Sequence, residues 1–320
     1  MHIRRPSRTY VIIQSLIFVK LIFLAFPVIG SALETQETRR RTGSEPGWST
    51  FLRGGYVHQL DTDIDHDGSF SADRLFIQSG ITYALDYHRS VSFALGYALD
   101  GYDFSGDTGF AALRPWKDIN SYRVSMPVRW GFNKAWTVFV VPTLRFSAES
   151  GADLEDAIQG GGVAGIFYRF GDQLTMGPGI AVISQIEDNA TVFPVLMVKW
   201  KITDRLSLET GRGLGATLGP GLVLRWQASD KWGLSVGVRY EKLRFRLDDK
   251  RMAPSGIGQD RAFPIFCSVS YSFSRRAQMS LFGGAEMAGE LRLEDEKGDR
   301  IAEEDYEAGG FGGITFNFRF

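Results

Sequence analysis

Cysteine, histidine and net charge are all scarce in this sequence. Its 320 residues contain one Cys and four His, and the formal net charge at pH 7 is −1. A lone Cys267 excludes an intramolecular disulfide. The near-zero net charge gives no support for a nucleic-acid partner. Glycine is abundant instead, with 37 residues, and aromatic residues make up 13% of the chain. With a mean hydropathy of −0.10, this is not the composition of a helical membrane protein.

Long hydrophobic runs are also rare. The one such run covers residues 10–32, follows a start with three Arg and ends in small residues, which predicts a secretory signal peptide over residues 1–32. A retained anchor is the alternative, since the run approaches the ~20 residues that span a bilayer. Lys20 and Pro27 disfavour that alternative. Residues 33–46 are then a short N-terminal periplasmic tail.

Convincing amphipathic helices are missing after the predicted cleavage site. Apolar and polar side chains alternate with a period of two instead, which predicts β-strands with one apolar face. Between Arg74 and Asp86, for example, the apolar face carries Leu75, Ile77, Ile81, Tyr83 and Leu85. The predicted strands are 47–60, 70–86, 90–100, 120–132, 136–147, 159–170, 173–186, 191–203, 205–212, 219–229, 231–243, 261–274, 277–291 and 307–320.

The connections between these strands alternate between short and long without a break. An even strand number, tight turns at one end and long loops at the other are typical of an outer-membrane barrel. Residues 47–320 are therefore predicted to form an all-β fold, a transmembrane antiparallel β-barrel of fourteen strands with both termini periplasmic. Twelve strands is the alternative, because prolines remove ladder hydrogen bonds. Five prolines fall inside predicted strands: Pro127, Pro142, Pro178, Pro194 and Pro264.

Tryptophan gives an independent indication of a membrane. Six of the seven Trp lie at the short-turn ends of the predicted strands, where indole favours the membrane–water interface. A soluble sandwich with aromatic strand ends is the alternative. It does not explain why the apolar faces avoid charge while the opposite faces carry Arg and Glu.

The chain ends in ITFNFRF, with Phe316, Phe318 and Phe320 on one face of an extended strand. This stretch resembles the C-terminal signature of Gram-negative outer-membrane β-barrel proteins, and in strand number the chain is similar to monomeric fourteen-stranded porins. The resemblance implies residence in the Gram-negative outer membrane and recognition of the three Phe by the barrel assembly machinery. Because an open edge cannot exist in lipid, the last strand is expected to pair with the first.

The faces opposite the apolar ones define the predicted lumen. They carry more basic than acidic residues, and a ring of Arg or Lys favours anions. The alternative is that these charges pair with one another and fill the barrel. The predicted pore-lining residues are Arg53, Arg74, Arg123, Arg129, Arg145, Arg169, Lys199, Lys201, Glu209, Arg225, Arg239 and Glu241, and Arg319, Asp86, Asp100 and Glu286 share their face.

One loop has the opening of a calcium-binding motif. Asp63, Asp65 and Asp67 follow the D-x-D-x-D-G pattern, which predicts a possible Ca²⁺ site over residues 61–69. Arg74 stands where such a loop needs a bidentate Glu, so a solvated acidic hairpin is the favoured interpretation. Other predicted outside loops are also acidic, and we expect them to recruit divalent cations beside lipopolysaccharide phosphates.

No catalytic constellation emerges from the sequence. Three His follow the signal peptide: His66 lies in the acidic loop, His88 lies in a short turn, and His58 has no Ser predicted beside it. Solvated surface histidines are the favoured interpretation, so no enzyme is expected. The leading hypothesis is a porin-like passive channel for small solutes with a weak anion preference, gated by residues 101–119 or 244–260. Two alternatives stay open: a closed structural or binding barrel whose acidic loops contact partners or lipopolysaccharide, and a carrier of hydrophobic compounds.

Overall fold

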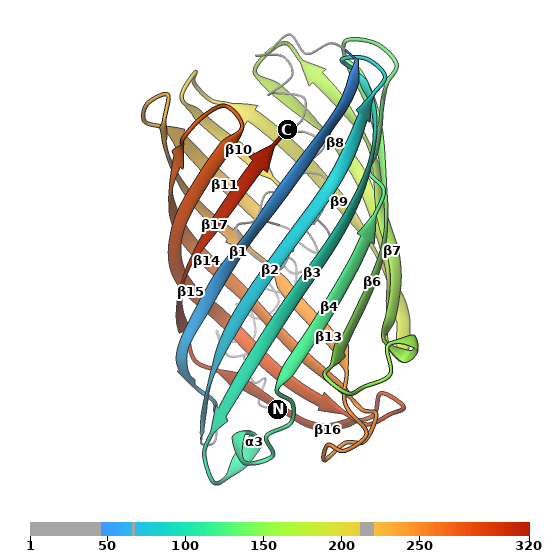
Figure 1. Cartoon of the computed structure of the whole chain (residues 1–320), viewed down its shortest axis with the longest axis vertical. Coiled ribbons are helices and arrows are strands. Elements are labelled where there is room, and N and C mark those ends of the chain that lie inside the picture. The colour runs from blue at the N-terminus through green and yellow to red at the C-terminus, as the bar shows by residue number, and fades with distance from the viewer. Residues whose placement is uncertain (1–45, 66–67, 212–220) are drawn as a thin grey trace, which may run out of the picture.

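The alternating segments of the chain pair in sequence order and close into a β-barrel (Figure 1). The computed structural model describes residues 46–65, 68–211 and 221–320. No helix among these residues is long and apolar enough to cross a membrane. The predicted signal peptide and most of the predicted tail lie outside the described residues. The strands are β1 (Gly47–Asp63), β2 (Ser69–Ala84), β3 (Arg89–Ser105), β4 (Asp118–Ser125), β5 (Val128–Gly131), β6 (Trp136–Glu149), β7 (Ile158–Phe170), β8 (Leu174–Gln185), β9 (Asp188–Lys201), β10 (Leu206–Thr210), β11 (Gly221–Gln227), β12 (Trp232–Arg239), β13 (Glu241–Arg246), β14 (Ile257–Ser272), β15 (Ala277–Glu294), β16 (Arg300–Tyr306) and β17 (Gly309–Arg319).

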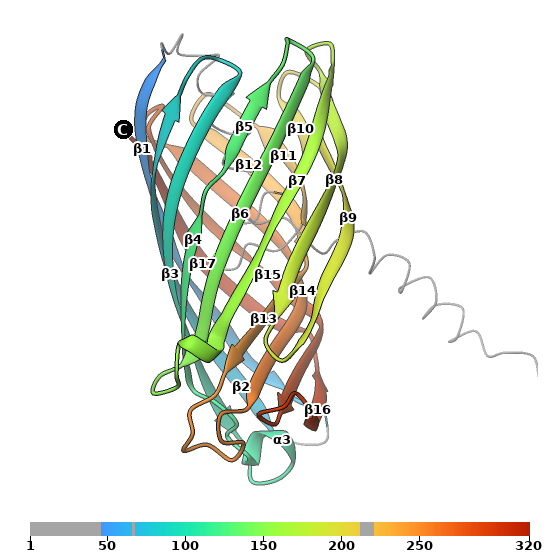
Figure 2. The same ribbon diagram turned by 90° about the vertical axis from the view of Figure 1, so that its right-hand side faces the viewer.

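Three pairs of these segments are single strands with an interruption. Both β4 and β5 pair with β3 and β6, both β12 and β13 pair with β14, and both β16 and β17 pair with β15. The seventeen segments therefore make fourteen barrel strands, which confirms the predicted number. Short helices, α3 (Gly109–Ala112) and η1 (Glu155–Ala157), lie in the loops at the end opposite the short turns (Figure 2).

The last strand pairs with the first, as predicted. Strand β17 is antiparallel to β1, with Phe316 opposite Gly54. Beyond the ladder, the Thr50 and Phe320 backbones exchange two hydrogen bonds, of 3.1 and 2.9 Å. A Cβ on Gly54 would lie 2.6 Å from the ring of Phe316, so glycine leaves the space that the aromatic ring occupies. Pairing at this seam leaves neither terminal strand with an open edge toward lipid.

The prolines are accommodated without loss of strands, so the twelve-strand alternative is wrong. Pro127 lies in the interruption between β4 and β5, where its carbonyl still accepts a hydrogen bond from Ser92 N at 2.8 Å. Pro264 follows a register shift between Arg261 and Phe263. Bulges and interruptions are the sites where a sheet tolerates proline.

The outer surface of the barrel is apolar, with aromatic rings near the short-turn end. Leu281 and Val236 are 57% and 52% exposed on this surface. Trp136 packs against Tyr168 with ring centroids 4.7 Å apart, and Trp232 against Tyr271 at 4.8 Å. These rings match the aromatic belt that membrane barrels place at the interface. The six Trp predicted for this belt are all exposed: Trp48, Trp130, Trp136, Trp200, Trp226 and Trp232.

Side-chain oxygens hold the short turns. In the turn after β2, Asp86 accepts backbone hydrogen bonds from His88 and Arg89 at 2.7 and 2.8 Å. Burial raises the pKa of Asp86, but these hydrogen bonds and the Arg89 guanidinium outweigh it and leave the pKa below its ordinary value. Asn133, Thr203 and Ser229 accept from the residues two and three positions on in the same way. Such Asx and ST turns reverse the chain within a few residues, so the strands at this end need no long loops between them.

Cys267 offers a direct test of the lipid-facing surface. It is exposed and stands opposite Val236 on the outside of the barrel. In intact membranes we expect a membrane-permeant maleimide to label Cys267 and a charged maleimide to leave it unmodified. The loop variant Lys297→Cys, at an exposed position, should react with both reagents in a Cys267→Ser background. Rapid labelling of native Cys267 by the charged reagent would contradict the proposed membrane belt.

Candidate functional site: the barrel interior

An apolar cluster fills the barrel interior at the long-loop end. We call it the mouth cluster, and Trp116 lies at its centre with its ring centroid 5.2 Å from Phe245, 5.6 Å from Phe104 and 5.7 Å from Phe110. Residues 101–119 and 244–260, each predicted as a gate, thus meet each other in this cluster. Its buried members are Ile64, Phe70, Ala72, Tyr102, Phe104, Phe110, Ala111, Trp116, Ile119, Leu243, Phe245, Leu247, Ala253, Ala262, Leu291, Leu293 and Tyr306.

Residues 241–257, which we call the strap, cross the mouth and are pinned on both sides. Arg246 pairs with Ala148 of β6, which in the barrel order lies far from β13. The Arg246 guanidinium donates to Glu187 Oε1 at 2.8 Å and to the Asp156 carbonyl at 3.2 Å. Arg251 donates from Nε to Glu149 Oε1 at 2.7 Å. The strap therefore ties one barrel wall to the other.

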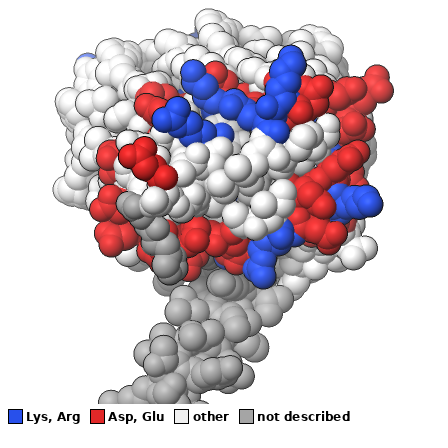
Figure 3. Space-filling view, turned by 90° about the horizontal axis from the view of Figure 1, so that it is seen from below, with Lys and Arg blue, Asp and Glu red and all other residues white. Residues whose placement is uncertain are grey.

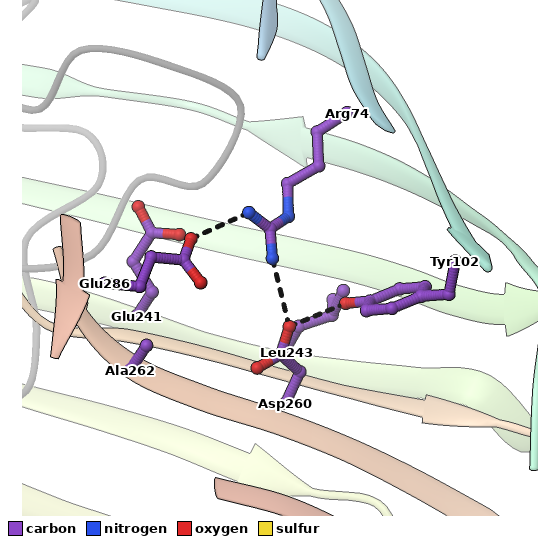
Figure 4. Close-up of a pocket in the computed structure, with 7 residues that line it drawn as sticks. All are labelled: Arg74, Tyr102, Glu241, Leu243, Asp260, Ala262 and Glu286. Atoms are coloured by element: carbon purple, nitrogen blue, oxygen red, sulfur yellow. Dashed lines mark hydrogen bonds and ion pairs between the residues drawn. The ribbon is translucent and has the colours of Figure 1, made fainter. Parts of the chain in front are cut away.

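A buried charge network lies directly under the mouth cluster (Figure 4). Arg74 donates from Nη1 to Glu286 Oε1 at 2.7 Å and from Nη2 to Asp260 Oδ2 at 3.1 Å. Tyr102 donates to the same Asp260 oxygen at 2.8 Å, and the Tyr306 hydroxyl lies 3.1 Å from Glu286 Oε2. All five side chains are buried. One guanidinium thus joins carboxylates from β14 and β15 to β2. Loss of the guanidinium would leave these buried carboxylates without a compensating charge.

The Arg74 network lines one cavity of the barrel interior. A second cavity lies beside it, nearer the short turns, and is lined by arginines. It is open to solvent, and the empty space in it, with the open part included, is about 490 Å³. Arg53, Arg123 and Arg145 line it together with Gln78 and Asp100. Arg53 donates from Nε to Gln78 Oε1 at 2.7 Å. Unlike the Arg74 network, this cavity holds three guanidinium groups and a single carboxylate.

None of the twelve predicted pore-lining residues is fully exposed. Arg74, Arg129, Glu209, Arg239 and Glu241 are buried, and the others are partly buried. Arg74 and Glu241 line one cavity. Arg53, Arg123 and Arg145 line the other. Seven predicted residues line neither cavity, although one of them, Arg239, forms an ion pair with Glu241: Arg129, Arg169, Lys199, Lys201, Glu209, Arg225 and Arg239.

Sequence reasoning missed several interior charges near the long loops. Asp260 precedes the predicted strand 261–274, whereas β14 begins at Ile257 and carries Asp260 inward. Glu290 and Glu294 lie beyond Ala288, a non-glycine residue at φ 49° beside the register shift that disturbs the alternation. Arg244 donates to Glu294 Oε1 at 3.0 Å. The buried interior under the loops is therefore rich in paired charge of both signs, not predominantly basic.

Comparisons with known proteins concern the fold alone. No model of a known protein family matches the sequence, and no curated protein matches it. Among solved structures, an outer membrane channel from Pseudomonas putida F1 has 11% identity and a TM-score of 0.49, with 87% of this chain and 97% of that chain covered. A Pseudomonas aeruginosa FadL homologue has 11% identity and a TM-score of 0.45, with 85% and 90% covered. The P. putida toluene transporter TodX has 10% identity and a TM-score of 0.43, with 87% and 91% covered.

The closed barrel, its apolar outer surface and its aromatic belt decide the class of protein. The chain is an outer-membrane-type β-barrel. Seen from the long-loop end, acidic side chains surround this barrel, with basic side chains among them (Figure 3).

His58 lies in a polar cluster on the outer surface of the barrel. The His58 ring lies with Nδ1 2.8 Å from Asp73 Oδ1, and Tyr56 donates to the same carboxylate. All three are exposed on the outer surface. Over the described ranges no serine hydroxyl lies within hydrogen-bond distance of His58. His66 lies outside the described residues, and His88 lies in a short turn.

The predicted calcium loop packs against β16. The Asp65 backbone donates to the Asp305 carbonyl at 2.9 Å, and the Asp63 carbonyl accepts from Glu307 N at 2.9 Å. Asp67 lies outside the described residues. Among the residues that are described, no group of three His, Cys, Asp or Glu side chains could hold a metal ion. Calcium binding by Asp63, Asp65 and Asp67 stays a prediction.

Proposed function

We propose that this barrel is a gated, passive outer-membrane channel for small solutes with a weak preference for anions. The observation that carries the anion preference is the charge of the interior between the arginine-lined cavity and the short turns. Strand parity directs nine basic side chains inward over this cavity and the interior below it, against Asp100 and Glu209 as the acidic side chains of the described strands. The nine are Arg53, Arg123, Arg129, Arg145, Arg169, Lys199, Lys201, Arg225 and Arg319. A basic constriction favours the passage of anions.

The mouth cluster and the strap are the proposed gate. Trp116 Nε1 is buried without a hydrogen-bond partner in the part of the chain that the structure describes. An unpaired buried donor costs about 1–3 kcal/mol, which weakens the closed arrangement. The polar contacts of Arg246 and Arg251 that pin the strap can be exchanged for water while β13 keeps its ladder with β14. The channel is accordingly expected to alternate between closed and open states.

The test is single-channel recording of the refolded protein in a planar bilayer under a KCl gradient. We expect discrete conductance steps and a reversal potential displaced toward the chloride equilibrium potential. Conductance with a cation-favouring reversal potential would contradict the anion preference while supporting the channel. Silence from a barrel shown to be folded by heat-modifiable electrophoresis would contradict the channel.

Two other functions have specific support. The buried Arg74 network and the mouth cluster support a closed structural or binding barrel, the function to which a silent folded protein would point. Inward-facing Phe139, Phe167 and Phe193 are buried with Val195 and Met197. This apolar patch supports a carrier of hydrophobic compounds, which would transport an uncharged aromatic solute without passing ions.

The same proposal includes where the barrel resides and how it is inserted into the membrane. We propose residence in the outer membrane of a Gram-negative cell, after export by a cleaved signal peptide. Recognition by the barrel assembly machinery would use Phe316, Phe318 and Phe320. Phe318 and Phe320 are exposed at the seam between β17 and β1, where a recognition factor could reach them. The acidic loops would contact lipopolysaccharide through divalent cations.

A further inference from the structure

The three arginines of the lined cavity stand in one hydrogen-bonded row of the barrel wall. Arg53 on β1 is opposite Gln78 on β2, and Gln78 is opposite Gly96 on β3. Gly96 is opposite Arg123 on β4, and Arg123 is opposite Arg145 on β6. We call this row the arginine rung. Its side chains project into the same cavity at the same height of the barrel.

Two like charges stand side by side on this rung. Directly opposed residues on neighbouring antiparallel strands have Cβ atoms about 4.5–5.5 Å apart, and like charges in such a pair destabilise the sheet. Arg145 donates from Nε to Ser147 Oγ at 2.8 Å, which does not offset charge. Across the described residues, neither Arg123 nor Arg145 has a carboxylate within ion-pair distance; Asp100 lines the cavity but forms its close contact with Arg74. An anion between the guanidinium groups would relieve this repulsion.

Glycine leaves a space for such an anion at the centre of the rung. A Cβ on Gly96 would meet Arg123 Cβ and Gln78 Cγ at 3.7 Å each, which is ordinary contact. The backbone therefore does not require glycine here, and the missing side chain opens the floor of the cavity between Arg53 and Arg123. A carboxylate on this floor could accept paired hydrogen bonds from guanidinium groups, the geometry for which arginine is suited.

The next row toward the long loops supplies an apolar wall. Phe76 stands opposite Ala98, and Ala98 stands opposite Ser121. On its other side Phe76 is opposite Gly55. Small neighbours leave the Phe76 ring uncovered toward the cavity, which Phe76, Ala98 and Ser121 all line. An apolar body of about one aromatic ring could pack there, next to the charged rung.

We propose that the arginine rung and Phe76 form a binding site for small monocarboxylates with an apolar body, of the size of benzoate. The carboxylate accepts hydrogen bonds from Arg123 and Arg145, with Arg53 completing the positive surround, and the ring lies against Phe76. This site rests on the proposed function, because a solute would reach it through the lumen. It specifies the channel's substrate class as amphipathic organic anions.

The test measures benzoate binding to the refolded full-length barrel in detergent by titration calorimetry. Binding in detergent does not require conduction, so its failure is distinguishable from failure of the channel proposal. We expect saturable binding by the native protein. Loss of one charge-assisted contact in Arg123→Gln should weaken it by at least about tenfold. Gly96→Leu, which fills the floor and keeps all three arginines, should abolish it.

Lys134→Gln is the matched control, because it removes one positive charge from an exposed short turn, remote from the rung and outside the set of nine inward basic side chains. We expect this variant to bind benzoate as the native protein does. Equal binding by the native protein and Gly96→Leu, or no saturable binding by the native protein, would overturn the site. Inorganic phosphate binding as tightly as benzoate would overturn the role of Phe76. Heat-modifiable electrophoresis verifies that each variant is folded, and Gly96→Leu keeps the proposal testable if Arg123→Gln does not fold.

Discussion

Replacing both Trp116 and Phe245 with alanine is expected to raise the open probability of the channel by at least about tenfold, since a 1.4 kcal/mol change suffices for that factor. Removing a buried aromatic ring from a packed core costs about 3–5 kcal/mol. Here the two rings join segments 101–119 and 244–260, so the lost packing energy destabilises the closed state of the mouth. Both side chains are at most 1% exposed, and their centroids are 5.2 Å apart. Single-channel recording at fixed voltage measures the effect directly.

The control for this variant is Phe93→Ala, which removes a ring from the lipid-facing surface of the same barrel. It should leave the open probability unchanged. If the Trp116→Ala, Phe245→Ala double variant conducts like the native protein while unfolding more easily, the mouth cluster stabilises the barrel without gating it.

Replacing Arg74 with methionine should have the largest effect on stability. Methionine keeps much of the side-chain volume but leaves Asp100, Asp260 and Glu286 without their shared guanidinium. Removing one partner of a buried ion pair costs about 3–5 kcal/mol, because the other charge stays buried and uncompensated. We expect a lower midpoint of unfolding in denaturant for the refolded barrel, measured by intrinsic fluorescence.

Neutralising the carboxylates tests the cause of that loss. Adding Asp260→Asn and Glu286→Gln to Arg74→Met should recover part of the stability, since the uncompensated charge is then removed. Arg169→Met, a partly buried arginine on β7 away from this network, should cost much less. If the triple variant is less stable than Arg74→Met alone, the network contributes through hydrogen-bond geometry and not through charge balance.

The parts of the fold that follow from local pattern were predictable. Period-two alternation located every barrel strand, because a lipid-facing apolar residue must be followed by an inward one. The pairing of β17 with β1 followed from the cost of an open edge in lipid. Trp136 and Trp232 were placed correctly because indole prefers the interface. Only the seam joins distant parts of the chain, and closure of the barrel alone required it.

The interior was less predictable because it depends on departures from that pattern. The register shift between Arg261 and Phe263 and the left-handed Ala288 alter which side chains face inward near the loops. Asp260, a partner of Arg74, was missed because it precedes the predicted strand 261–274, whereas β14 begins at Ile257. Trp116 lies in a loop without periodicity, so its burial against Phe245 could not be inferred from spacing. The arginine rung could not be predicted either, because it depends on which residues of neighbouring strands stand opposite each other. Fourteen predicted strand boundaries do not fix that register.

The seam between β1 and β17 has a consequence for biogenesis. Phe51 and Arg319 are neighbours in the wall, although almost the whole barrel separates them along the chain. Closing so long a loop has an entropic cost that no earlier hairpin contact offsets, so this seam is expected to form last. A chain that lacks β17 would present two unsatisfied edges to lipid, where no water can satisfy their backbone groups. We therefore expect that a chain without β17 does not form a stable barrel in a bilayer, so that completion of the last strand and membrane insertion are coupled.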